Sequence, residues 1–185
     1  MAERVSRLPP LPDPLPAAVQ ELFAERIKRS GRVLNVHHAF GHAPKLSWAS
    51  MQMAMALRFE TSTPRLFIET AIVRAAQLAR GVSELQQHKP MLLAAGFSQA
   101  KLGALEQWRT SALFDEKERA LLAYVDEMAD HGNVGDATFN ELGRFFTPEQ
   151  IMELSFAVGS YYGTALIMNA LQIKLEPRSS DGGSR

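Results

Sequence analysis

The sequence predicts an all-α protein, and three features carry this prediction. Apolar residues recur at spacings of three and four along most of the chain, which is the period of an amphipathic helix. No segment of useful length alternates apolar and polar residues as a half-buried strand would, and there is no glycine-rich phosphate loop. Helix start signals precede several apolar segments, at Thr63-Pro64, at Ser83 with Gln86, at Asp115 with Glu118, and at Thr147-Pro148 with Gln150.

The predicted helices follow one another along one domain. Residues 1–12 are rich in proline and are predicted to form an extended arm, and residues 177–185 a flexible tail rich in glycine and serine. Residues 13–176 are predicted to form a single domain, because a chain of 185 residues can bury one sizeable core. The predicted helices, several ending near Gly96, Gly132 or Gly135, cover residues 14–29, 33–41, 44–59, 64–80, 83–95, 98–109, 116–131, 136–145 and 148–174.

Glu69 is a charged residue within the largely apolar helix predicted at 64–80. The other polar residues of that helix, Thr70, Arg74 and Gln77, are spaced by four and three, so they share one stripe, which we predict to face solvent. Glu69 points away from this stripe toward apolar neighbours. A buried carboxylate tends to keep its proton to higher pH, which suits a general acid or base. The alternative is a purely structural ion pair with an arginine across a helix contact.

Glu84 and His88 form a second candidate pair. Because four residues separate them, they lie on one helix face, where a carboxylate can orient an imidazole and favour its charged form. Such a pair suits proton transfer near neutral pH, although a solvated surface pair has the same spacing. Pro90 has no N–H for the carbonyl of Gln86, so a kink or a new helix start is predicted just after His88.

These residues also carry a family resemblance. The stretch from Thr63 to Ser98 resembles the core motif of the carboxymuconolactone decarboxylase family, which includes the alkylhydroperoxidase D-like proteins. The interval of 19 residues between Glu69 and His88 matches the glutamate-to-histidine interval of that family. The resemblance implies an alkylhydroperoxidase D-like helical bundle. It rests on Pro64, Glu69, Arg74, Ser83-Glu84-Leu85-x-x-His88 and Ala94-Ala95-Gly96-Phe97-Ser98, and on weaker similarities at 34–36, 42–44, 114–122, 136–146 and 161–170.

The chain departs from the peroxidase-type members of the family. In those members a Cys-x-x-Cys motif precedes the histidine, and its cysteines would stand at positions 81 and 84 of this chain. This chain has Gly81 and Glu84 there, and it contains no cysteine. Disulfide exchange needs thiolates, so a cysteine-dependent peroxidase is excluded. The pattern is closer to the decarboxylase-type Tyr-Glu-Trp-x-x-His, with Ser83 and Leu85 in place of the aromatic residues.

The resemblance implies cofactor-independent proton transfer on a small carboxylated or lactone-like molecule, as in 4-carboxymuconolactone decarboxylase, a carboxy-lyase. His88 would exchange the proton at the carbon that loses carbon dioxide, Glu69 would relay it, and Glu84 would set the tautomer and charge of the imidazole. An anionic substrate also needs a cation, from this chain or a neighbouring subunit, or a helix N-terminus. The predicted substrate-binding residues are Ser83, Arg74 and Tyr162.

Several alternatives stay open at this point. An isomerase or a hydrolase would use the same three catalytic residues, and the two carboxylates with the histidine are also possible metal ligands, although we predict neither a metal nor a cofactor. A second functional class is a non-catalytic relative, either a helical scaffold or a small-molecule-binding protein. Length, charge and helix pattern do not separate these classes.

Charge and composition restrict the partners. Lysine plus arginine equals aspartate plus glutamate at 20 each, and the pI is about 7.0, so no basic field invites nucleic acid or an anionic membrane. Residues 154–173 carry no charge and are long enough to cross a bilayer, but polar residues and glycines interrupt them, so we predict a central helix instead. The lack of cysteine fits the cytoplasm. The resemblance further implies a homo-oligomer, a trimer or a hexamer.

Overall fold

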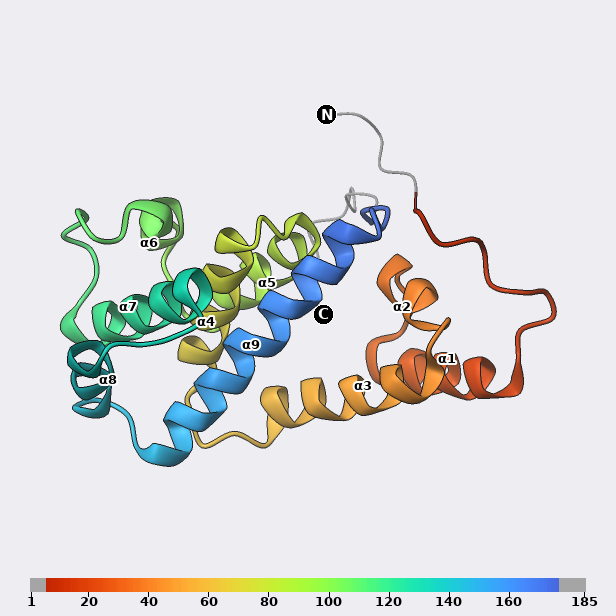
Figure 1. The fold of residues 1–185 in the computed structure, drawn as a ribbon, viewed down its shortest axis with the longest axis horizontal. Coiled ribbons are helices and arrows are strands. Elements are labelled where there is room, and N and C mark those ends of the chain that lie inside the picture. The colour runs from red at the N-terminus through yellow and green to blue at the C-terminus, as the bar shows by residue number, and fades with distance from the viewer. Residues whose placement is uncertain (1–5, 177–185) are drawn as a thin grey trace. The chain divides into compact units, whose positions relative to one another are not determined.

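The computed structural model describes residues 6–176, and all regular structure within that range is helical (Figure 1). This confirms the all-α prediction. Residues 6–12 of the predicted arm contain no helix or strand, while residues 1–5 and the predicted tail at 177–185 lie outside the described residues. The elements of the described range are α1 Ala17–Ser30, α2 Asn35–Phe40, α3 Pro44–Phe59, α4 Arg65–Leu78, α5 Val82–Ala94, α6 Gln99–Ala104, the 3-10 helix η1 Leu105–Gln107, α7 Glu116–His131, α8 Asp136–Gly143 and α9 Pro148–Ala170.

The structure divides the chain into two compact units. In their described parts, the first consists of residues 6–52 and 168–176, and the second consists of residues 53–167. The sequence predicts one domain at 13–176, which stays a prediction. All candidate site residues lie in the second unit.

The second unit is built around α4. Every residue of α4 from Ile68 to Ala76 is buried, because the helix packs against both α5 and α7. Thr70 and Arg74 are therefore buried, and the prediction that their stripe faces solvent is wrong. The polar residues of this stripe are tolerated inside because they are bonded: the hydroxyl of Thr70 donates to the carbonyl of Leu66, and Arg74 pairs with Asp126.

Two of the predicted helix starts are confirmed by the side-chain bonds expected of them. The N–H of Glu118 donates to Oδ1 of Asp115 at 2.8 Å, and the N–H of Asp115 donates to Oε2 of Glu118 at 3.0 Å, so a capping box begins α7. Thr147 and Gln150 exchange the equivalent bonds at the start of α9, at 3.3 and 3.1 Å.

The predicted caps at Thr63 and Ser83 are wrong. Pro64 is the N-cap of α4, and the hydroxyl of Thr63 instead donates to Oε2 of Glu153 on α9 at 2.5 Å. Helix α5 begins at Val82, so Ser83 already lies inside its first turn. The helix also continues through Pro90 to Ala94, so no new helix starts after His88.

The segment predicted as one helix at 98–109 is divided in the structure. Helix α6 ends at Ala104, and the 3-10 helix η1 follows from Leu105 to Gln107. Arg119 of α7 holds the segment after η1. Its guanidinium donates to the carbonyls of Trp108, Arg109, Ser111 and Phe114, which fixes these backbone groups without a continuing helix.

Helix α9 is the one described helix whose length and composition would allow it to cross a membrane. In the structure Leu154, Ala157 and Val158 of this helix belong to the core of the second unit, but only 28% of its most apolar window is buried, so the prediction of a central helix is confirmed for one face only. That core also takes Ile68 and Ile72 from α4. A second apolar cluster joins α4 to α5, η1 and α7, and consists of Val73, Leu92, Phe97, Leu105, Trp108, Phe114 and Leu122.

His37 is the most strongly perturbed titratable group of the first unit. Its Nδ1 accepts the N–H of Leu34 at 3.0 Å, which caps α2. Burial, together with the positive charge of Arg26 and the neighbouring His38, lowers the pKa of His37 to about 4. The imidazole of His37 is therefore neutral at physiological pH and acts as a structural acceptor.

Candidate functional site

Glu69 and His88 meet inside the second unit. Nδ1 of His88 lies 2.8 Å from Oε2 of Glu69, although 19 residues separate them. Glu69 is fully buried and His88 is 7% exposed. When the Glu69 carboxylate is ionised it can only accept a hydrogen bond, and the proton of this bond is then carried by Nδ1 of His88. Nε2 is then the nitrogen of His88 that remains for chemistry.

The two helices that carry this pair make the geometry rigid. Glu69 lies in the second turn of α4 and is fully buried, in a helix that packs against α5 and α7. His88 follows in the second turn of α5 after a short connection at 79–81. In that connection the N–H of Gly81 donates to the carbonyl of Ala76 at 2.8 Å, which folds α5 back along α4. The two side chains therefore meet because α4 and α5 form a tight helical hairpin.

Arg65 is a member of the site that the sequence analysis missed. Its Nη2 is hydrogen-bonded to Oε1 of Glu69, so the carboxylate lies between the guanidinium and the imidazole of His88. Nη1 of Arg65 also donates to the carbonyl of Leu57 at 3.3 Å. The signal for this pair was present in the sequence, since Arg65 precedes Glu69 by four residues on one helix.

Glu84 is buried one turn before His88 on α5, and its predicted role in setting the tautomer and charge of the imidazole stays a prediction. The carboxylate that bonds His88 Nδ1 and orients the ring is that of Glu69, and not that of Glu84. Oε2 of Glu84 lies against the backbone at Gly81, where a Cβ would stand 3.0 Å from it. The same Cβ would stand 2.6 Å from the Cβ of Ala165 on α9. The Glu84 carboxylate is therefore packed into the α4–α5 connection.

The tyrosine at the site is Tyr161, whereas the sequence analysis selected Tyr162. The ring of Tyr161 meets the imidazole of His88 edge to face, with 4.7 Å between ring centroids. Tyr162 packs on the core formed by α4, α7 and α9. Periodicity alone could not choose between two adjacent aromatic residues on a helix that is apolar on most sides.

Neither of the other two predicted substrate-binding residues is bonded to the Glu69–His88 pair. Nε of Arg74 donates to Oδ1 of Asp126 at 2.6 Å, and the other oxygen of Asp126 accepts from Trp108 and Arg109. Arg74 is thus held in a buried ion pair between α4 and α7. Ser83 is buried, and its Oγ accepts from the side-chain amide of Gln87 at 3.4 Å.

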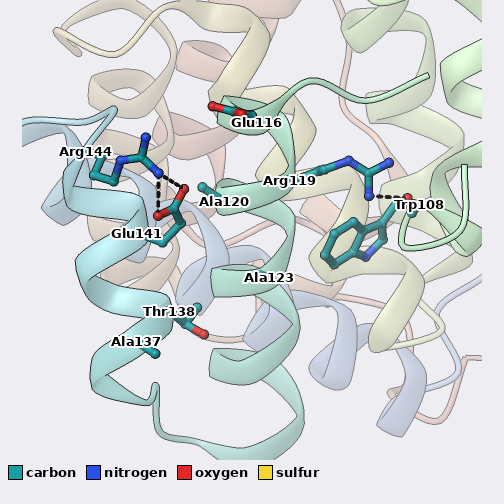
Figure 2. A pocket seen from close by; sticks show the side chains of 9 residues that line it. All are labelled: Trp108, Glu116, Arg119, Ala120, Ala123, Ala137, Thr138, Glu141 and Arg144. Carbon is teal, nitrogen blue, oxygen red and sulfur yellow. Dashed lines mark hydrogen bonds and ion pairs between the residues drawn. The ribbon is translucent and has the colours of Figure 1, made fainter. Parts of the chain in front are cut away.

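A surface hollow of about 440 Å³ lies between α7, α8 and the segment after η1 (Figure 2). Its two arginines are already bonded, Arg144 to Glu141 and Arg119 to backbone carbonyls, so they are not available to a substrate. None of the three catalytic candidates lines it. Its lining consists of Trp108, Glu116, Arg119, Ala120, Ala123, Ala137, Thr138, Glu141 and Arg144.

Metal ligation is not supported by the side chains within residues 6–176. In this range no three or more histidine, aspartate or glutamate side chains are grouped so that they could hold a metal ion. Glu69 and His88 are instead engaged with each other and with Arg65. A buried carboxylate that orients an imidazole is an arrangement that can transfer protons.

Residues 44–127 match the carboxymuconolactone decarboxylase family, and this segment contains Arg65, Glu69, Glu84 and His88. The matched segment, which is less than half of the chain, is therefore similar to this family. No curated protein matches the chain. The chain has Gly81 and Glu84 at the two positions where the peroxidase-type members of that family would place cysteines.

Solved structures share the fold of the chain. An uncharacterised peroxidase-related protein from Silicibacter sp. TM1040 superposes with a TM-score of 0.78 at 20% identity, covering 92% of each chain. The debrominase Bmp8, in complex with 2,3,4-tribromopyrrole, superposes with a TM-score of 0.76 at 16% sequence identity over 94% of each chain. The chain also resembles a protein of unknown function from Agrobacterium tumefaciens, described as a putative antioxidant defence protein AhpD. The TM-score is 0.69 at 23% sequence identity, covering 76% of this chain and 97% of that one. At these identities the likeness establishes the alkylhydroperoxidase D-like fold.

Proposed function

We propose that this protein is a cofactor-independent acid/base enzyme that resembles 4-carboxymuconolactone decarboxylase and acts on a small carboxylated or lactone-like substrate. The observation that carries this proposal is the buried 2.8 Å bond between Oε2 of Glu69 and Nδ1 of His88. A histidine oriented by a carboxylate can take up and return a proton near neutral pH without any cofactor. The absence of cysteine directs the proposal away from thiol-dependent peroxide reduction.

In the proposed decarboxylation, the bond between the substrate carbon and its carboxylate breaks and carbon dioxide leaves. The electron pair of that bond stays on the carbon, and the proton on Nε2 of His88 is transferred to it. His88 is then neutral and recovers a proton from water. While Nε2 is protonated, the imidazolium is stabilised by Glu69, which accepts from Nδ1 throughout.

The size of the proposed substrate is supported by the comparison with the debrominase. That protein has the same fold and was crystallised with 2,3,4-tribromopyrrole. We infer that the substrate of this chain is a small ring of similar dimensions, bound next to His88. Tyr161, edge-on to the imidazole, is the aromatic residue placed to border such a ring.

The test compares the native protein with His88→Asn and Glu69→Gln on a panel of lactones and carboxylated lactones, with carbon dioxide release and product analysis as readouts. We expect His88→Asn to lower turnover by roughly 100-fold or more, because general acid–base catalysis contributes about that much. His131→Asn, which changes an exposed histidine at the end of α7, is the control and should keep native turnover.

The products of the same experiment discriminate among the alternatives. Carbon dioxide release supports the carboxy-lyase, whereas an isomerised or ring-opened product without carbon dioxide would assign an isomerase or a hydrolase to the same pair. If the native protein turns over no member of the panel, and both variants change only the melting temperature, the site is structural. The chain would then be a scaffold or a small-molecule-binding protein.

We also propose that the protein acts as a homo-oligomer in the cytoplasm. The first part is supported by α9, which exposes Met152, Phe156, Leu166 and Ile167 along one face. Single exposed apolar residues are common, but a row of them on one helix is typical of an interface between subunits. The family resemblance favours a trimer or a hexamer.

A further inference from the structure

The guanidinium of Arg65 occupies a defined position between two acceptors. Nη1 donates to the carbonyl of Leu57 in the last turn of α3, and Nη2 is bonded to Oε1 of Glu69. The last four carbonyls of a helix lack intrahelical partners and carry partial negative charge, so this end of α3 is a favourable place for a cation. The side chain of Arg65 is 31% exposed, whereas that of Glu69 is fully buried.

The three side chains form a continuous chain of bonds from a fixed cation to an exchangeable proton. Arg65 bonds one oxygen of Glu69, and the other oxygen accepts from Nδ1 of His88. An arginine stays protonated at any physiological pH. Its charge therefore compensates that of Glu69 permanently, and no proton is needed at the carboxylate to keep the buried pair neutral.

The charged groups named here on the helices that pack against α4 have partners or positions of their own. Glu84 lies on α5 one turn before His88 and adds a further carboxylate, and α9 presents the ring of Tyr161 to the imidazole. On α7, Glu118 is bonded to Lys101, and Asp126 is bonded to Arg74. Lys117 of α7 stands over the rings of Phe67 and Phe146, 4.6 and 4.5 Å from their centroids.

We propose that Arg65 is a positioning residue for the proton-transfer reaction: it keeps Glu69 ionised, so that the His88 proton stays on Nδ1 and Nε2 is the nitrogen that exchanges protons. The importance of this role for catalysis rests on the proposed function, but the protonation states of Glu69 and His88 do not.

Loss of the charge at position 65 has a definite consequence for Nε2. Without Arg65 the pair of Glu69 and His88 gains by taking up one proton from water. If that proton resides on Glu69, the carboxyl group donates to Nδ1 and the imidazole proton moves to Nε2. If it resides on His88, the imidazolium carries protons on both nitrogens. In either state Nε2 is protonated.

The experiment measures the two ring nitrogens of His88 by long-range proton–nitrogen NMR on protein labelled with ¹⁵N-histidine, with the signals assigned by their loss in His88→Asn. At mildly alkaline pH we expect the native protein to show a protonated Nδ1 and an unprotonated Nε2. In Arg65→Met we expect a protonated Nε2 at the same pH.

Two variants separate charge from packing. Arg65→Lys retains the charge and should restore the native state of Nε2. Arg29→Met removes an arginine that pairs with a glutamate at the same four-residue spacing on the surface of α1, and it should leave His88 unchanged. If Arg65→Met does not fold, Arg65→Gln keeps a donor toward Glu69 without the charge, and the same result is expected of it.

The proposal is overturned if Nε2 is equally unprotonated in the native protein and in the charge-free variants, or if the native ring carries its single proton on Nε2. These outcomes are independent of turnover. The expected spectra in a protein that is inactive on the whole substrate panel would refute the proposed function alone. Unchanged spectra in Arg65→Met, together with native decarboxylation, would refute the role of Arg65 alone.

Discussion

At Gly81 the chain passes so close to α9 that a side chain does not fit. A Cβ there would stand 2.6 Å from the Cβ of Ala165 and 3.0 Å from Oε2 of Glu84. The backbone dihedral φ of Gly81 is −80°, which any residue adopts, so the requirement for glycine at this position is one of space. The Cβ of Ala165 is attached directly to the helix backbone, so it cannot rotate away from a side chain at position 81. The absence of a Cβ at Gly81 also leaves room for the Glu84 carboxylate.

We predict that Gly81→Ala lowers the free energy of unfolding by about 1–3 kcal/mol, the usual cost of forcing a methyl group into a packed site. Ala165→Gly should recover part of this loss in the double variant, so urea denaturation of the double-variant cycle should give a favourable coupling between the two sites. Gly103→Ala is the control, because nothing lies within 4 Å of a Cβ at Gly103. Purely additive effects of Gly81→Ala and Ala165→Gly would contradict the clash.

Glu153 on α9 fixes the loop that precedes α4. Its carboxylate accepts the N–H of Ser62 at 2.7 Å and the N–H of Thr63 at 2.8 Å, and it also accepts both hydroxyls. Burial, the largest single influence, raises the pKa of Glu153, but the hydrogen bonds from Thr63 and Ser62 together outweigh it and leave the pKa below its ordinary value of 4.5. This loop leads directly to Arg65, the first residue of α4.

We predict that Glu153→Gln lowers the free energy of unfolding by about 1.5–3 kcal/mol at neutral pH, since hydrogen bonds to a charged group contribute that much. A lowered pKa in the folded protein means that the stabilisation is complete above 4.5 and is lost as the pH falls through the folded-state pKa. The difference between native and variant should therefore shrink in acid. Thermal denaturation across this pH range measures it, with the exposed Glu149→Gln as control. A difference that grows in acid would contradict the assignment.

The elements themselves were predictable because their signals are local. The capping box of Asp115 and Glu118 forms as the sequence indicates. The predicted meeting of Glu69 and His88, which lie 19 residues apart, is also observed. What the sequence could not supply is the identity of partners across helix contacts. Arg74 is apart from the pair because Asp126, distant in sequence, binds it between α4 and α7.

On the scale of the whole molecule, α9 has two faces with different surroundings. One face supplies Leu154, Ala157 and Val158 to the core, while Met152 and Phe156 are more than half exposed on the other. The same outer face continues to Gly163, where a Cβ would meet nothing within 4 Å. With 20 positive and 20 negative side chains, two copies of the chain would not repel each other through net charge.

We predict that Phe156→Glu converts the proposed homo-oligomer to a monomer, because an interface built on this face would have to bury an unpaired carboxylate near its centre. Size-exclusion chromatography with light scattering over a range of protein concentrations measures the change. Phe139→Glu on α8 is the matched control, since Phe139 is exposed to a similar degree, 47% against 54% for Phe156, and should leave the assembly intact. A native protein that is monomeric at every concentration would contradict the proposed oligomer. An oligomer that survives Phe156→Glu would place its interface elsewhere, because the outer face of α9 would then have no role in assembly.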